Sequence, residues 1–481
     1  MKPNILLIVI DSFNAEKFFG ETKTSVTPTI DYLIKNGTYF NKAITVATTT
    51  IPSISSIFTG LYPLQSIKQI GKILKINDNI ENYIKKLKNH GYSTHAIVPK
   101  IISLANLNSI FDENIEEFDS FATLYDGVGE QILKNIDSNQ KNPWFCYAHL
   151  MDIHGDATFH LGQKLKKYEN SKFGDNRYER MISAMDPWLK KIIEKIDFDN
   201  TIVILTADHG SFTANYDLDM EKQNDISNKK RETKVNGSYK IGHQIFTNLP
   251  SVFNPMRKFI SEKYIKKRNK NIDIKIKSQL NETNFSDLSE YKKRLLKNSI
   301  DSIPKLFDDI CRVPLLFIGF KIPKKIISDQ VKNIDIFSTI FDLIGLKNEL
   351  NTSSQSLVPL MEDKKIEQTD IFINSITNSD DEIVCGIRTN NFKYFRKING
   401  TVEDGLLFNL KNDPNEEINI IKKEKEIAEE LEKKLIVFLD STENSTENST
   451  ENSTENSTEN STENSTENDE VEAELKKLGY L

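Results

Sequence analysis

The residue types that could do chemistry in this chain gather where hydrophobic runs end. Asp11 follows the run "NILLIVI", and Asp208 with His209 follows "TIVILTA". Continuous aliphatic runs are typical of the buried strands of a parallel sheet, whose carboxyl ends are where α/β proteins bind ligands. Two carboxylates and an imidazole at that edge could share one divalent cation with a hydroxyl oxygen. Taken alone, an aspartate after a strand could equally cap a helix.

The stretch "TTTIPSISSIFTGLYP" at residues 48–63 offers the hydroxyls, seven of them between Thr48 and Thr59. Pro52 has no backbone N–H and suits the first turn of a helix, so Thr50 or Ile51 is expected near the N-cap of a short helix. The N-terminus of that helix would present partial positive charge to a bound anion. The stretch alone does not say which hydroxyl reacts.

Strand-like and helix-like segments alternate along most of the chain. Further strands are expected at 93–100, 143–150, 200–210 and 313–320, and helices at 27–37 and 79–91, where Gly37 suits a helix C-cap. This order predicts an α/β/α sandwich with a mostly parallel central sheet. Past residue 345, the short segments "DIFINSI", "EIVCGIRT", "FKYFRKI" and "GLLFNL" predict a small antiparallel sheet, followed by a Lys/Glu-rich helix over about 415–437.

Composition divides the chain further. We expect a catalytic domain over 1–346 with a basic insertion at about 250–306, a C-terminal subdomain and helix over 347–440, a disordered repeat at 441–468, and a terminal segment at 469–481. The insertion, with 13 Lys/Arg against 5 Asp/Glu over 256–300, is either a lid that attracts anions or a solvated helical segment. The repeat is seven copies of Ser-Thr-Glu-Asn, which lack apolar residues to bury.

Charge balance, cysteine count and the length of apolar runs exclude few classes of function. Without the seven repeat glutamates, 63 basic residues balance 63 acidic ones, so charge indicates no nucleic-acid partner. Three widely separated cysteines form no disulfide or metal-binding pattern. The six apolar residues after Asn4 are too few for a signal peptide or a membrane span, and no other stretch approaches 18 apolar residues. We therefore expect a cytoplasmic protein without a membrane span.

Ordered motifs along nearly the whole chain resemble the sulfatases, a family of the alkaline phosphatase superfamily. The resemblance begins with a strand ending in Asp11, continues through "TPTIDYLIKNGTYFNKA" and "TIPSISSIFTGLYP", and covers all but the basic insertion and the repeat. The later motifs, in order, are "HLMDIHGD", "ILTADHG", "GHQIF", "CRVPLLF", "IDIFSTIFDLIGL", "QSLVPLM", "GIRTNNFKYFR", "LFNLKNDPNE" and the terminal "AELKKLGYL". Each motif is modest alone, but their order is specific.

The resemblance implies roles for individual residues. The family pattern Cys/Ser-x-Pro-Ser-Arg falls on residues 50–54, which makes Thr50 the nucleophile position. The residues implied as ligands of one divalent metal ion are Asp11, Thr50, Asp208 and His209. Their three oxygens and one nitrogen admit Ca²⁺, Mg²⁺, Mn²⁺ or Zn²⁺. A second metal is not indicated, since Asp152 is the only nearby carboxylate for it.

Three further residues are implied to contact the substrate. His154 in "DIHGD" and His243 in "IGHQ" match family histidines beside the anionic group or the leaving oxygen. Each could instead be a hydrogen-bonded structural histidine. Lys100 is a weak counterpart of the Lys-Trp-His that the family carries after the second strand. The implied substrate is a small anionic ester, free or linked to a glycan.

Departures from the family pattern bear on the chemistry. Threonine is not converted to formylglycine, Ile54 stands where an arginine is expected, and Ser12 stands where a second acidic residue often follows the first ligand. A single threonine hydroxyl activated by a metal could form a phosphothreonine that water then hydrolyses. We therefore expect a sulfatase-like hydrolase of phosphate or sulfate esters, with phosphate favoured.

Two other functions stay open on the sequence. The first is a transferase that moves a phospho-alcohol group to a glycan or lipid, although relatives with that activity usually carry membrane helices. The second is a non-catalytic binding protein of the same fold. Retention of all four implied metal ligands argues against the second, and the oligomeric state is not indicated.

Overall fold

We describe a computed structural model of the chain. The described residues are 2–70, 73–111, 114–138, 143–154, 165–211, 291, 306–376 and 383–451, with side chains in the last range up to 442. The chain divides into two units, residues 1–214 with 303–481, and residues 215–302. Apart from Tyr291, everything described belongs to the first unit. The expected basic insertion lies almost wholly outside the described residues, as do His243, the end of the repeat and the terminal segment.

The first unit is built around an eight-stranded sheet in the order β12-β2-β11-β9-β1-β8-β6-β7. Its strands are β1 (Asn4–Ile10), β2 (Thr38–Phe40), β6 (Ser93–Pro99), β7 (Ile115–Phe118), β8 (Trp144–Leu150), β9 (Thr201–Thr206), β11 (Leu315–Gly319) and β12 (Lys325–Ile327). The five strands from β9 to β7 run parallel to one another, whereas β11 is antiparallel to both β9 and β2. The predicted α/β fold with a mostly parallel sheet is confirmed.

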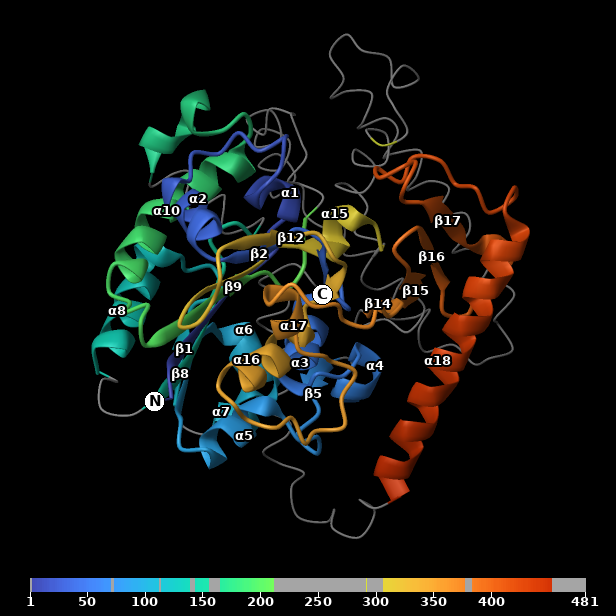
Figure 1. The fold of residues 1–481 in the computed structure, drawn as a ribbon, viewed down its shortest axis with the longest axis horizontal. Coiled ribbons are helices and arrows are strands. Elements are labelled where there is room, and N and C mark those ends of the chain that lie inside the picture. Colours follow the sequence, from blue (N-terminus) through green and yellow to red (C-terminus); the bar gives the residue numbers. More distant parts are fainter. Residues whose placement is uncertain are drawn as a thin grey trace, which may run out of the picture. The chain divides into compact units, whose positions relative to one another are not determined.

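Helices cover both faces of this sheet (Figure 1). The described α-helices are α1 (Ala15–Phe18), α2 (Pro28–Asn36), α3 (Thr50–Thr59), α4 (Pro63–Ser66), α5 (Tyr83–Asn89), α6 (Lys100–Ile102), α7 (Asn108–Phe111), α8 (Val128–Ser138), α10 (Arg177–Ile193), α15 (Asp308–Cys311), α16 (Asp335–Leu343), α17 (Val358–Met361) and α18 (Lys425–Glu451). Helices α3, α7 and α16 pack on one face through aromatic contacts of Phe58 with Phe111, Tyr147 and Phe337. Helices α2, α8 and α10 pack together on the other face.

The central strands are buried on both faces because each carries an unbroken apolar run. All but the first residue of β1 is buried, and every residue of β8 and β9 is buried. Such burial stabilises the sheet by about 25 cal/mol for each Å² of apolar surface removed from water. The rigid sheet fixes the positions at which β1, β8 and β9 end, and those ends carry the residues of interest.

One expected glycine has a different role from the predicted one. Gly37 does follow α2 as its C-cap, but its backbone is extended rather than left-handed. A Cβ at this position would lie 2.3 Å from the carbonyl oxygen of Phe317. Gly37 is therefore required by the close approach of β11, not by the helix end.

The C-terminal subdomain is a four-stranded antiparallel sheet, as predicted from its short apolar segments. Its strands are β14 (Ile371–Ser375), β15 (Val384–Arg388), β16 (Phe392–Lys397) and β17 (Leu406–Asn409), in that order. The remaining short strands pair as β10 (Arg312–Val313) and β13 (Val331–Lys332) with β3 (Ala43–Ile44), and β4 (Ile67–Ile70) with β5 (Ile73–Ile76). Helix α18 packs on β15 and β16 through Leu431 and Leu435.

Helix α18 differs from its prediction at both ends. It begins at residue 425 rather than near 415, and it continues to Glu451, past residue 441, where disorder was predicted. The apolar stripe that anchors it ends near Phe438. Extending an existing helix costs far less than starting one, so the helix runs on into the first copies of the repeat. There Ser441 and Thr442 donate hydrogen bonds to the carbonyl oxygens of Phe438 and Leu439.

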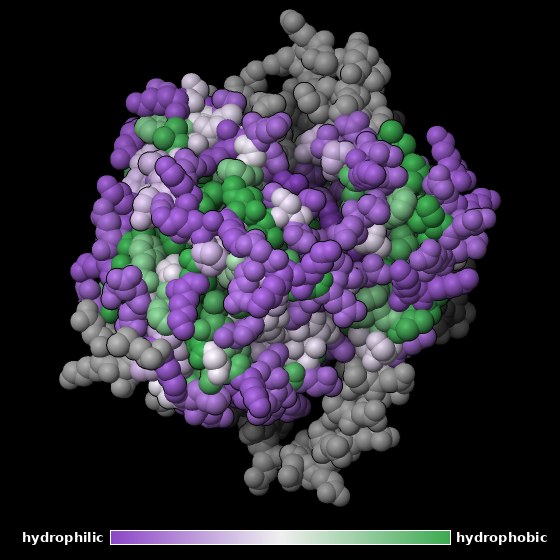
Figure 2. All heavy atoms as spheres, in the orientation of Figure 1, coloured by the Kyte–Doolittle hydropathy of each residue, from purple (hydrophilic) through white to green (hydrophobic). Residues whose placement is uncertain are grey.

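The surface agrees with the balanced composition. Figure 2 shows hydrophilic side chains over most of the face in view, with hydrophobic ones in small separate groups. In the part of the chain that the structure describes, no helix is long and apolar enough to cross a membrane.

Candidate metal centre and active site

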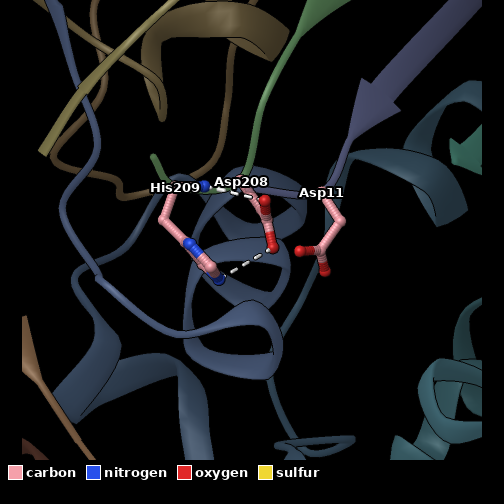
Figure 3. A group of neighbouring side chains, drawn as sticks. All are labelled: Asp11, Asp208 and His209. Atoms are coloured by element: carbon pink, nitrogen blue, oxygen red, sulfur yellow. Dashed lines mark hydrogen bonds and ion pairs between the residues drawn. The ribbon is translucent and has the colours of Figure 1, made fainter. Parts of the chain in front are cut away.

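Three chain segments bring the predicted ligands together. Asp11 follows β1, Asp208 and His209 follow the neighbouring strand β9, and Thr50 is the first residue of α3. Because β1 and β9 are parallel, with Val9 beside Thr206, both strands deliver their carboxylates to the same edge of the sheet. Figure 3 shows Asp11, Asp208 and His209 at this edge, with the carboxylates on one side of the imidazole.

The four side chains form a compact group. The hydroxyl of Thr50 donates to Oδ2 of Asp11 over 3.2 Å and lies 3.4 Å from Nε2 of His209. That nitrogen lies 3.4 Å from Oδ2 of Asp208. The ligand atoms of Asp11, Asp208 and His209 all lie within 4.8 Å of one another. Of the seven hydroxyls considered, the one on Thr50 is directed at this group of side chains.

The hydrogen bonds leave suitable lone pairs for a cation. Oδ1 of Asp208 accepts from the backbone N–H groups of Ser12 and His209, at 3.1 and 2.8 Å. Oδ2 of Asp208 is buried and accepts no hydrogen bond within the described residues. Nδ1 of His209 lies 2.9 Å from the carbonyl oxygen of Gly210. Because a carbonyl oxygen only accepts hydrogen bonds, Nδ1 carries the proton of the neutral ring and Nε2 is unprotonated. These donors fit a divalent cation.

Electrostatics at the site point the same way. Burial opposes ionisation of Asp11, but the charges of His154, His149 and His209 outweigh it and hold the pKa of Asp11 well below its ordinary value. Burial, together with the charge of Asp11, raises the pKa of Asp208. Burial also works against protonation of His209, yet the two carboxylates raise its pKa. The site therefore attracts positive charge, and a metal ion could take the place of the histidine proton.

The helix start differs slightly from the prediction. The N-cap is Thr49, one residue before the expected position, and Pro52 lies in the first turn as predicted. The hydroxyl of Thr49 donates to the carbonyl oxygen of Ile376, and that of Ser53 donates to the carbonyl oxygen of Asp208. These neighbouring hydroxyls hold the helix in place, whereas Thr50 faces the site.

The structure places the two described residues that were predicted to contact the substrate at the ends of different strands. His154 is half-buried beyond the end of β8, and its charge acts on Asp11. Lys100 begins α6 at the end of β6, which is separated from β1 by β8.

Asp152 is fully buried, and both its oxygens accept from the backbone N–H of Leu124. Asp152 thus supports the chain at Leu124, which disfavours a second metal there. His243 lies outside the described residues.

Two residues that contact the Asp11 carboxylate were not predicted from the sequence to take part in the site. Ser12 was considered only as a missing acid, but its hydroxyl donates to Oδ1 of Asp11 over 2.6 Å. His149, fully buried in β8, has Nε2 3.5 Å from Oδ2 of Asp11. A histidine inside an otherwise apolar strand was the signal that could have singled it out, because a buried imidazole requires a partner.

Comparisons with known proteins agree with this geometry. A family model described as "Sulfatase" matches residues 3–236, and one described as "N-sulphoglucosamine sulphohydrolase, C-terminal" matches residues 304–441. Together they cover about three quarters of the chain. The chain belongs to the sulfatase family. Sulfatases are hydrolases that act on ester bonds, and the resemblance seen in the motifs is confirmed.

Individual relatives are distant. The chain is 26% identical over 234 residues to the ulvan-active sulfatase of Formosa agariphila, a match that spans 44% of this chain and 45% of that protein, less than half of its length. It is 21% identical to arylsulfatase K of Bos taurus, over 90% of this chain and 81% of that protein.

Solved sulfatase structures share the fold. One described as a 2-O GAG sulfatase has a TM-score of 0.59 at 14% identity, covering 93% of each chain. Another, solved with its substrate D-glucosamine-2-N,6-O-disulfate, has a TM-score of 0.57 at 14% identity, covering 93% of this chain and 99% of that one.

Proposed function

We propose that this protein is a metal-dependent hydrolase that cleaves phosphate esters with Thr50 as its nucleophile. The observation that carries the proposal is the position of the Thr50 hydroxyl, 3.2 Å from Asp11 and 3.4 Å from His209, at the start of α3. Asp11 and Asp208 are buried, whereas Thr50 and His209 are partly exposed. A substrate therefore reaches the site from the side of the nucleophile.

The residues of the chain divide the chemical work. Asp11, Asp208, His209 and Thr50 would hold a divalent cation, which would lower the pKa of the Thr50 hydroxyl and neutralise charge on the ester. Oγ of Thr50 releases its proton to solvent and forms a bond to phosphorus, while the bond from phosphorus to the alcohol oxygen breaks. Water then attacks the phosphothreonine and breaks its bond from phosphorus to Oγ, which releases phosphate, and Oγ takes a proton back from solvent. The N-terminus of α3 points its backbone N–H groups towards the anion.

The departing alcohol oxygen needs a proton. His154 supports this role because it is half-buried and lies close enough to act electrostatically on Asp11. In the proposal, His154 donates to the leaving oxygen and afterwards accepts a proton from the attacking water. His243 and Lys100 remain predicted substrate contacts.

Two residues support phosphorus over sulfur as the centre that is attacked. Thr50 offers one hydroxyl, so it has no second hydroxyl to expel sulfate from a covalent intermediate. Ile54 occupies the position of the family arginine and is 1% exposed in the hydrophobic core, so it offers the anion no charge. Direct attack of water on a phosphothreonine does not require either group.

Sulfate-ester hydrolysis is the second candidate, and the names of the relatives favour it. The matched proteins are called an ulvan-active sulfatase and arylsulfatase K, and one structural neighbour is described with a sulfated glucosamine as its substrate. These names also support an anionic ester carried on a glycan as the substrate class.

One set of assays separates the candidates. Purified protein is assayed with aryl phosphate, an aryl phosphodiester, an aryl phosphonate ester and aryl sulfate, each with Mg²⁺, Ca²⁺, Mn²⁺ or Zn²⁺. We expect turnover of at least one phosphorus ester in the presence of one metal, and loss of at least 10³-fold in Thr50→Ala. The matched control is Thr49→Ala, which removes a neighbouring hydroxyl directed at Ile376 instead.

The outcomes are distinguishable. Turnover that survives in Thr50→Ala would overturn the nucleophile, and turnover of aryl sulfate alone would overturn the preference for phosphorus. A protein that binds a metal but turns over none of the four esters would favour a transferase, and one that binds no metal would favour a non-catalytic protein. The cytoplasmic location stays a prediction and is tested by fractionation of the source cells.

A further inference from the structure

A buried pair of side chains on β8 lies behind Asp11. Tyr147 and His149 are two residues apart on this strand, so their side chains lie on the same face of the sheet. The Tyr147 ring packs against Phe58 of α3, which identifies that face as the one beneath the helix that begins with Thr50. Both side chains are 0% exposed.

The contacts of His149 run from the core to the site. Nδ1 of His149 lies 2.8 Å from the hydroxyl of Tyr147. Nε2 lies 3.5 Å from Oδ2 of Asp11, the oxygen that also accepts from Thr50. Nε2 has no other hydrogen-bond partner among the described residues. A buried imidazole nitrogen with one polar neighbour is expected to be directed at that neighbour.

The chemistry of the neighbours decides where the ring proton lies. An ionised Asp11 has only acceptor atoms, so the nitrogen that faces it has to carry a hydrogen. Burial, with the charges of Asp208 and Asp11, raises the pKa of Tyr147 well above its ordinary value, so its hydroxyl stays protonated and can donate. In a neutral His149 the hydrogen is then on Nε2, and Nδ1 accepts from Tyr147. His209 has the opposite arrangement, with hydrogen on Nδ1 and an unprotonated Nε2 that faces the proposed metal.

We propose that His149 is a positioning residue for the Asp11 carboxylate, held by Tyr147 in the form that carries hydrogen on Nε2. The N–H group of His149 limits rotation of the carboxylate and leaves it preorganised for the cation. The inference rests on the proposed role of Asp11 as a metal ligand. Partners that orient a ligand in this way typically change metal affinity by 10- to 100-fold.

Two amide substitutions test the proposal with matched chemistry. His149→Gln places an N–H donor near the position of Nε2, where it reaches Asp11, whereas His149→Asn places its amide near Nδ1, where it reaches only Tyr147. Isothermal titration with Mn²⁺ and with Zn²⁺ measures the affinity of the full chain and of each variant. We expect His149→Gln to bind within about threefold of wild type and His149→Asn to bind at least about tenfold more weakly.

Two controls separate positioning from a general loss of structure. Unfolding in urea with a chelator present should give similar stabilities for the two amide variants. Nitrogen-15 spectra of histidine-labelled, metal-free protein should show His149 with hydrogen on Nε2, and Tyr147→Phe should increase the form with hydrogen on Nδ1. The spectra do not depend on metal binding or on turnover.

The outcomes identify which statement fails. If wild type binds Mn²⁺ or Zn²⁺ and His149→Asn binds as tightly, the positioning role is wrong while the proposed function stands. If the spectra show His149 with hydrogen on Nδ1 in wild type, the positioning role is wrong whatever the titrations give. If the spectra agree but wild type binds neither these ions nor Mg²⁺ or Ca²⁺, the proposed metal site is wrong and His149 does not act through a ligand.

Discussion

The backbone N–H of Ser12 donates a hydrogen bond to Oδ1 of Asp208 over 3.1 Å, although 196 residues separate the two in the chain. The Ser12 hydroxyl donates to Oδ1 of Asp11 over 2.6 Å, so one residue holds both carboxylates. Ser12 has a φ of 62°, in the left-handed region, and Tyr178 fixes it by donating to its carbonyl oxygen over 2.7 Å. The turn after β1 thus sets the separation of the two acids.

This arrangement predicts the effect of restoring the family's second acid. Ser12→Asp introduces a third carboxylate beside Asp11 and Asp208, and aspartate adopts the left-handed region without much strain. Without metal, the added repulsion should lower the free energy of unfolding by about 1–3 kcal/mol. Affinity for Ca²⁺ should rise relative to Zn²⁺, because the ligand set gains a hard oxygen.

The measurements are unfolding in urea with a chelator and calorimetric titration with each ion. Ser12→Asn is the control, since it keeps the backbone conformation accessible and adds no charge. Equal Ca²⁺ affinity in Ser12→Asp and Ser12→Asn would contradict the prediction.

A second prediction concerns removal of the metal. Asp208 is 0% exposed and has its pKa raised by burial and by the charge of Asp11, so the two acids repel each other without a cation. A chelator should lower the melting temperature of wild type; metal at 100 times its dissociation constant stabilises by about 2.7 kcal/mol. Asp208→Asn should melt at or above chelated wild type and should not respond to added metal. If wild type melts at the same temperature with and without chelator, the proposed metal site is contradicted.

The fold and most of the site could be predicted because their signals are local. The apolar run before Asp11 and the one before Asp208 each specify a buried strand that ends in an acid, and parallel strands bring those ends to one edge. The proline in the first turn of α3 placed the helix start to within one residue of its position in the structure. These features depend on a few consecutive residues, so the sequence carries them directly.

What the sequence did not reveal depends on contacts between distant segments. The link from His149 to Asp11 requires the register of β8 against β1, which no local pattern specifies. Gly37 is needed because β11 passes close to it, about 280 residues later in the chain. The extension of α18 into the repeat depends on a helix anchored by packing on another sheet, which composition alone does not indicate.

A third prediction tests whether the family arginine could simply be restored. Ile54 belongs to α3, and its side chain is 1% exposed and packs in the hydrophobic core. Ile54→Arg should therefore lower the free energy of unfolding by about 3–5 kcal/mol, the usual cost of a buried charge without a partner, and should add no turnover of aryl sulfate. Ile54→Leu, the control, should cost less than about 1.5 kcal/mol. Urea unfolding and the sulfate assay measure both effects; a stable variant that gains sulfatase activity would show that the arginine reaches the site.

The last prediction uses the pH dependence of stability. Asp152 is 0% exposed, and burial raises its pKa to about 7, although hydrogen bonds from the Leu124 N–H act in the opposite direction. The folded protein therefore keeps a proton on Asp152 between about pH 4 and pH 7 that the unfolded chain has lost. Because the unfolded state binds fewer protons in this window, stability falls as the pH rises through it.

The full difference between the two pKa values corresponds to at most about 4 kcal/mol. Asp152→Asn cannot ionise, so its free energy of unfolding should fall less between pH 5 and pH 8 than that of wild type. The control is Asp137→Asn, at an exposed carboxylate paired with Lys195, which should keep the wild-type dependence. Urea unfolding at pH 5, 6, 7 and 8 gives the slopes, and a slope in Asp152→Asn equal to that of wild type would show that Asp152 ionises normally in the folded protein.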